Sequence, residues 1–145
     1  LAGITIPDSV TKIGNLAFGN CNNLTNIIIP DSVKVVGYSA FFNCEKLATA
    51  TIGSGVTEIG YYAFYNCNQL TNVYCYPAYP PTAKCAEKDA ELWSAFVNNS
   101  NLKIHVPRKG SSLYKTWKHW SNYADSIRVL LEDKEFTVIE LPKYI

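Results

Sequence analysis

Hydrophobic residues return at the same positions every 23 residues through the first half of the chain. Each unit opens with a leucine, continues with apolar residues at alternate positions, and then carries a valine, a glycine and an Ala-Phe pair. The aligned columns include Leu1, Leu24, Leu47 and Leu70; Ile6, Ile29, Ile52 and Cys75; Val10, Val33 and Val56; Gly14, Gly37 and Gly60; and Phe18, Phe41 and Phe64. This pattern predicts one structural unit repeated in tandem.

The alternation predicts a short strand in each unit. In LTNIIIP, Ile27 and Ile29 would face the interior, and Pro30 would end the strand because proline has no N–H to donate. VTKIG, VKVVG and VTEIG predict a second, shorter extended segment, and we expect the glycine that ends it to adopt a positive φ. LAF, SAF and YAF then predict a tight helical turn, with phenylalanine as the large core residue.

A unit of 23 residues is too short for two long helices, but it fits one turn of a flattened coil. No single turn can bury its apolar side alone, so we expect the turns to stack on one another. The period and the L-x-x-I-x-I core are typical of a leucine-rich-repeat solenoid. The predicted fold is therefore an α/β solenoid, mostly β, with 23-residue turns.

IPDSVTKIGNLAFGNCNNL and IPDSVKVVGYSAFFNCEKL resemble the BspA-type leucine-rich repeats, also described as the Treponema pallidum type. The shared pattern, I-P-x-x-V-x-x-I-G-x-x-A-F-x-x-C-x-x-L, runs over three consecutive units and covers residues 1–75. The resemblance implies a right-handed superhelix, a place at the cell surface or outside the cell, and a role in adhesion or protein binding. Host matrix proteins are among the ligands that it suggests.

The rest of the chain departs from the repeat. AFVNNSNL at 95–102 repeats the Ala-Phe spacing after an insertion of about nine residues, and residues 103–127 resemble the end of such arrays. We predict three regular repeats at 1–75, a degraded fourth repeat with a C-terminal cap at 76–127, and a terminal strand, linker or tail at 128–145. The cap would contain a glycine turn at Gly110, a helix N-cap at Ser111 or Ser112, and a helix. That helix would carry Leu113, Tyr114, Trp117 and Trp120.

Composition and charge narrow the class of function. The net charge of +1 argues against a nucleic-acid binder, and no apolar run is long enough to span a bilayer. The chain has no methionine and starts within the repeat pattern, so we expect it to be a fragment of a longer protein. Basic residues gather near the C-terminus, where we expect them to remain in water on the outer side of the cap: Arg108, Lys109, Lys115 and Lys118.

Three cysteines recur with the repeat, at Cys21, Cys44 and Cys67. Neighbouring parallel strands lie within disulfide reach, but stacked side chains point the same way and three equivalent thiols cannot all pair. Zinc needs four converging ligands, and a nucleophile needs a histidine, which residues 1–75 lack. We predict small, buried, reduced core residues without metal. Whether Cys75 and Cys85 form a disulfide stays open.

The remaining candidates for chemistry favour a protein without catalytic activity. His105 is predicted on the outer side of a strand, and His119 on the aromatic helix of the cap. No triad, phosphate-binding loop or dinucleotide fingerprint is present, and we expect no cofactor. The repeated Asn20, Asn43 and Asn66 are predicted to bond loop backbone groups.

Outward strand positions are the predicted ligand-binding surface, because solenoids bind through extended faces. The candidate residues are Asn26, Ile28, Thr49, Thr51, Asn72 and Tyr74, in columns that begin at Gly3 and Thr5. A second candidate is the aromatic set on the opposite loops, namely Tyr38, Phe42, Tyr61, Tyr62 and Tyr65.

We therefore predict a non-catalytic, extracellular or cell-surface module that binds a protein or glycan and is a monomer. The alternative is a purely structural spacer within a larger surface protein. The identity of the ligand and the number of preceding repeats stay open.

Overall fold

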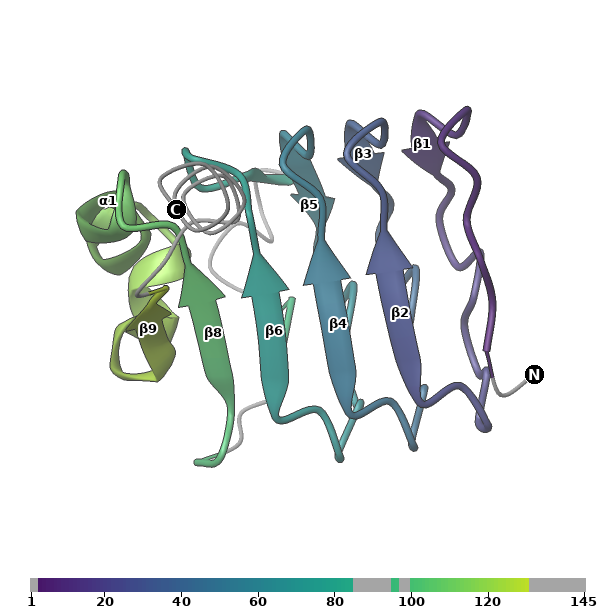
Figure 1. The fold of residues 1–145 in the computed structure, drawn as a ribbon. Helices are drawn as coiled ribbons and strands as arrows, with labels where there is room; N and C mark the ends of the chain where they lie inside the picture. The colour runs from purple at the N-terminus through teal and green to yellow at the C-terminus, as the bar shows by residue number, and fades with distance from the viewer. Residues whose placement is uncertain (1–2, 85–94, 97–99, 131–145) are drawn as a thin grey trace, which may run out of the picture.

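The computed structural model describes residues 3–84, 95–96 and 100–130. It is a row of similar turns stacked side by side, with one parallel sheet along each side (Figure 1). The larger sheet is ordered β2 (Asn26–Ile29), β4 (Thr49–Ile52), β6 (Asn72–Cys75), β8 (Lys103–Val106) and β9 (Ile127–Val129). The smaller sheet is ordered β1 (Lys12–Ile13), β3 (Val35–Val36), β5 (Glu58–Gly60) and β7 (Thr82–Lys84).

The strand register places equivalent residues of successive repeats side by side. Asn26 pairs with Thr49 and Thr49 with Asn72, so equivalent residues lie directly beside each other. Asn72 then pairs with Lys103, and the longer connection between β6 and β8 contains the inserted segment. The stacked mostly-β solenoid predicted from the period is confirmed.

The core runs between the two sheets. Leu24, Leu47, Leu70 and Leu102 form one buried column. The rings of Phe18, Phe41, Phe64 and Phe96 form another, with neighbouring centroids 5.3, 5.0 and 5.5 Å apart. Phe41 is fully buried, as predicted.

The predicted helical return after the second strand is wrong. Phe18 N–H donates to the Ala40 carbonyl and Phe41 N–H to the Ala63 carbonyl, both at 2.8 Å. These donors are therefore used between turns, and residues 15–20 form successive hydrogen-bonded turns instead of a helix. A helix would have directed the same N–H groups along its own axis.

The predicted positive φ at Gly14, Gly37 and Gly60 is also wrong. A Cβ on Gly60 would lie 2.4 Å from the Tyr38 backbone nitrogen, so glycine is needed there for close approach of neighbouring turns. The positive φ values fall on other residues of each turn, which are Leu16 and Asn20, Ser39 and Asn43, and Tyr62 and Asn66.

The asparagine column is a side-chain ladder, which corrects the predicted bonds to loop backbone. Asn43 Nδ2 donates to Asn20 Oδ1 at 3.0 Å, and Asn66 Nδ2 donates to Asn43 Oδ1 at 2.7 Å. Asparagine tolerates the left-handed backbone that these positions adopt. Asparagine thus both tolerates the left-handed backbone and forms the side-chain hydrogen bonds between turns.

The first turn of the stack is less buried than the repeat predicts. Residues 3–6 form no strand, and Cys21 and Phe18 are only partly buried. No described residue covers the outer side of this turn, whereas the equivalent Cys44 and Phe41 lie between two turns and are fully buried. Burial in a solenoid comes from neighbours on both sides.

The C-terminal segment consists of helix α1 (Ser111–Thr116), the 3₁₀ helix η2 (Trp120–Ser126) and β9. Tyr114 and Trp120 are buried, as predicted, and Gly110 has the expected turn geometry with φ 92°. The helix is shorter than predicted, because Trp117 is extended and His119 has φ 73°. The N-cap is Gly110 instead of a serine, and Trp117 remains 38% exposed.

Candidate functional site

The outward face of the five-stranded sheet brings the predicted ligand-binding residues together. Strand side chains alternate between the two faces, so the inward positions of β2 are buried and the outward ones exposed. The register aligns two outward rows across the strands. One row is Ile28, Thr51, Tyr74, His105 and Arg128, and the other is Asn26, Thr49, Asn72 and Lys103.

All six residues singled out from the sequence lie on this outward face. Asn26 and Ile28 are exposed, and Ile28 leaves 62% of its side chain in water. Thr49, Thr51, Asn72 and Tyr74 are half-buried, because neighbouring outward side chains cover part of each. An exposed isoleucine on a sheet face is an apolar contact available to a partner.

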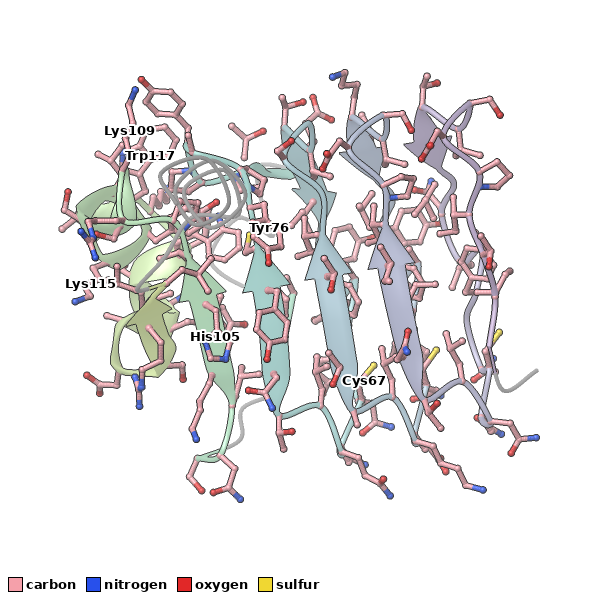
Figure 2. All side chains as sticks on the ribbon, in the orientation of Figure 1. Cys67, Tyr76, His105, Lys109, Lys115 and Trp117 are labelled. Carbon is pink, nitrogen blue, oxygen red and sulfur yellow. The ribbon has the colours of Figure 1, made fainter. Side chains whose placement is uncertain are left out.

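His105 belongs to this face, although the sequence suggested only an ordinary surface residue. It lies on β8 (Figure 2). Its ring stacks on Tyr74, with centroids 4.6 Å apart and planes inclined at 12°. Its Nε2 lies 2.9 Å from Asn72 Oδ1, which fixes the orientation of the imidazole. The insertion before β8 breaks the 23-residue period, so the period alone could not place His105 beside Tyr74.

The charge of the face changes along the stack. The outward residues of β2, β4 and β6 are uncharged, and Lys103, His105 and Arg128 follow on β8 and β9. Partial burial lowers the pKa of His105, and the charges of Lys103 and Arg128 lower it further. A neutral imidazole at pH 7 is therefore favoured, and the fixed positive charge lies on Lys103 and Arg128.

The cysteine column stabilises the stack and offers no exposed nucleophile beyond Cys21. Cys44 Sγ donates to the Phe18 carbonyl at 3.2 Å, and Cys67 Sγ donates to the Phe41 carbonyl at 3.1 Å. The neighbouring Cys44 thiol, together with burial, raises the pKa of the Cys67 thiol. The prediction of burial holds for Cys44 and Cys67 but not for Cys21, which is only partly buried, and in the structure these three thiols form no disulfide with one another.

Cys75 is a buried thiol beside Tyr114 of α1. Burial raises its pKa to about 12, and its sulfur lies 3.5 Å from the Tyr114 hydroxyl. Cys85, with which it was considered as a pair, lies outside the described residues. Within the described part of the chain, no three His, Cys, Asp or Glu side chains gather as a metal ion would require.

The second candidate surface, the aromatic set on the opposite loops, is largely used between turns. Tyr38 stacks on Tyr61 at 5.3 Å, and Phe42 stacks on Tyr65 at 5.8 Å. Tyr38 and Tyr65 still expose 37% and 43% of their side chains. These rings contribute mainly to stacking of the turns, so the sheet face is the stronger candidate for a ligand.

A family described as the BspA type leucine-rich repeat region matches residues 1–105 of the chain. The chain belongs to this family. The match includes the strands from β1 to β7 and most of β8, up to His105. The resemblance inferred from the I-P-x-x-V-x-x-I-G pattern is therefore confirmed.

Solved structures of two leucine-rich-repeat proteins are similar to this BspA-type chain. The pneumococcal vaccine antigen PcpA is 20% identical with a TM-score of 0.57, over 92% of this chain and 30% of PcpA. The T. pallidum leucine-rich-repeat protein is 21% identical with a TM-score of 0.45, over 69% of this chain and 53% of that protein. The similarity to PcpA supports the fold, and no curated protein matches the chain.

The chain thus spans about half, or less, of the length of these structural neighbours. A search of the described residues for a helix with the length and apolar character of a membrane span finds none.

Proposed function

We propose that this chain is a non-catalytic binding module that holds a protein ligand on the outward face of its five-stranded sheet. The observation that carries the proposal is the continuous row of outward side chains from Ile28 to Arg128, across all five strands. The row contains an exposed aliphatic side chain and the stacked pair Tyr74 and His105. We place the module outside the cell or at the cell surface.

Several properties of the face support a protein ligand. Aromatic side chains and arginine are frequent where proteins bind each other, and Tyr74 and Arg128 occupy the same row. The stack of Tyr74 on His105 and the bond from His105 to Asn72 hold the centre of the face in one conformation before binding. A pre-organised surface loses less entropy when a partner docks.

The family supports the same proposal. BspA-type repeat proteins are commonly surface proteins involved in binding, and repeat solenoids generally present extended faces to their partners. Host extracellular matrix proteins are the first class of ligand to test. Among the described residues, the half-buried His105 has an amide and a tyrosine ring as neighbours instead of a nucleophile, which fits binding better than catalysis.

The test is a binding screen of the purified chain against immobilised host matrix proteins and glycans, followed by variants of the face. Ile28→Asp and Tyr74→Ala should each weaken binding of the captured ligand by about tenfold or more, as expected for central contacts of an interface. Tyr65→Ala is the matched control, because it removes the same ring from the opposite loops.

Two results would overturn the proposal. If Tyr65→Ala weakened binding and Tyr74→Ala did not, the ligand would use the aromatic loops. If no ligand were captured, and the chain served only to hold other parts of the protein at a fixed distance, the spacer hypothesis would replace this one.

A further inference from the structure

A proline-rich loop at residues 76–81 presents one tyrosine to solvent. The loop reads YPAYPP, and its three prolines restrict the backbone to few conformations. Pro77, Pro80 and Pro81 are buried, whereas Tyr79 exposes 65% of its side chain. The loop therefore anchors its prolines in the protein and directs the tyrosine outward.

Side chains of the C-terminal segment hold this loop at both ends. The buried Tyr114 hydroxyl donates to the Pro77 carbonyl at 2.5 Å. The buried Trp120 Nε1 donates to the Pro81 carbonyl at 2.7 Å. Between these two points, Ala78 lies so close to Gly110 that a Cβ on Gly110 would overlap the Ala78 carbonyl oxygen. The position of Tyr79 is thus fixed by α1 and η2.

Tyr79 meets a second exposed ring, which comes from the end of α1. Its centroid lies 6.5 Å from that of Trp117, and the two planes are inclined at 29°. Trp117 exposes 38% of its side chain, although the sequence predicted it to pack on the last turn. Two segments that are 38 residues apart therefore build one exposed aromatic pair on a rigid support.

Two exposed lysines flank segments that form this pair. Lys109 precedes Gly110, which touches the loop, and Lys118 follows Trp117; both lysines are exposed. Lys109 and Trp117 lie at the same end of the molecule in Figure 2. The only acidic residue among those described in the C-terminal segment is Asp125. An exposed aromatic pair next to lysines attracts an anion and disfavours a cationic ligand.

We propose that Tyr79, Trp117, Lys109 and Lys118 form a second binding site, and that its ligand is an acidic saccharide. The C–H face of a sugar ring packs on exposed aromatic rings, and its sulfate or carboxylate groups pair with the lysines. A nucleic acid would also stack and carry charge, but its closely spaced phosphates call for a larger basic surface than these lysines and a net charge of +1 provide. This site is separate from the sheet face and does not rest on it.

Dextran sulfate and dextran are the probes, because they share one polymer backbone and differ in charge. The full chain should bind dextran sulfate in isothermal titration, and uncharged dextran at least about tenfold more weakly. Tyr79→Ala and Trp117→Ala should each weaken dextran sulfate binding by about three- to tenfold, the size expected of an exposed ring contact. Trp117→Phe, which retains an aromatic ring, should lose less affinity for dextran sulfate than Trp117→Ala.

Two lysine variants distinguish a specific site from general electrostatic attraction to the protein. Lys109→Ala should weaken binding, whereas Lys12→Ala, the same change at an exposed lysine of β1 at the opposite end of the stack, should not. Equal losses in both lysine variants, or undiminished binding by Tyr79→Ala, would overturn the proposal. Tyr79 is exposed, so Tyr79→Ala should fold normally by circular dichroism, and this check keeps the test decisive even if Trp117→Ala is unstable.

Two further measurements test whether the site binds nucleic acid instead, and whether the saccharide binds on the sheet face. A thymidine oligonucleotide that bound as tightly as dextran sulfate, and lost affinity in Trp117→Ala, would show a nucleic-acid site and overturn the saccharide proposal. Tyr74→Ala should leave dextran sulfate binding unchanged. If it abolished that binding, the saccharide would sit on the sheet face, and the aromatic pair would not be a site.

Discussion

The repeated residues of this chain are fixed by contacts that each copy makes with the next. Phe41 lies between the rings of Phe18 and Phe64, and its backbone N–H bonds to the following turn. Cys67 uses its thiol to satisfy the Phe41 carbonyl. At these positions the side chain fills the core and also binds a neighbouring turn, so a substitution affects two turns at once.

Phe41→Ala should lower the free energy of unfolding by ~3–5 kcal/mol, because it opens a cavity between two stacked rings. The adjacent Phe42→Ala is the control, since Phe42 is only half-buried and stacks on one ring; it should cost less than about half as much. Urea unfolding followed by circular dichroism measures both. A loss below ~1 kcal/mol for Phe41→Ala would contradict its inward placement.

The burial of the thiols predicts their reactivity. In a Cys85→Ser variant, a thiol reagent should label Cys21 in the native protein, and Cys44, Cys67 and Cys75 only after denaturation. Burial and the neighbouring Cys44 raise the pKa of Cys21, so its reaction should be slower than that of a free thiol. Rapid native labelling of Cys67, or stoichiometric zinc in the purified protein, would contradict this arrangement.

At the scale of the element, backbone N–H groups in each turn donate hydrogen bonds to the next turn instead of along a helix. The return segments donate their N–H groups across the stack, and the asparagine ladder continues this pattern with side chains. Both the ladder and the left-handed backbone at Asn20, Asn43 and Asn66 repeat in every regular turn. The turn is therefore stable only as a member of the stack.

Asn43→Ala should destabilise the protein by about 2 kcal/mol, because it removes two side-chain hydrogen bonds and leaves a left-handed backbone to alanine. Asn43→Gly relieves the backbone strain and should cost about 1 kcal/mol less. Asn26→Ala, on the exposed face, should change stability by less than about 0.5 kcal/mol. Equal effects of Ala and Gly at position 43 would show that backbone strain contributes nothing.

At the scale of the whole molecule, the stack changes character at its C-terminal end. Without β8 and β9, the edge of β6 and the buried side chains next to it would be open to other chains. Instead α1, η2 and β9 follow, with Tyr114 and Trp120 buried against the loop at 76–81. We propose that this segment is the cap of the solenoid, with its lysines in water.

Deleting residues 103–145 should produce a chain that aggregates, because it removes two strands and both buried aromatic anchors. Light scattering and the melting temperature measure the effect. A chain that ends at Leu130 is the control and should remain monomeric. If the longer deletion stayed soluble and monomeric with unchanged melting, the cap proposal would fail.

The regular half of the fold could be predicted closely from the sequence. Ile27, Ile29 and Pro30 indicated the strand, its inward side and its end, because a period of two and a missing N–H are local properties. The six face residues followed from the same alternation. The glycine conformation, the supposed helical turn and the length of the C-terminal helix were wrong, since each depends on contacts with a neighbouring turn or loop.

The sequence by itself determined the repeat, the inward phenylalanine and leucine columns, and which strand positions face outward, because these depend only on spacing along the chain. Only the tertiary structure decided which residues before the insertion contact which residues after it. It placed His105 on Tyr74, and it joined Tyr79 to Trp117 through hydrogen bonds from Tyr114 and Trp120. The physical reason is that a repeat period specifies neighbours only while it is unbroken, and beyond it packing and hydrogen bonding select the partners.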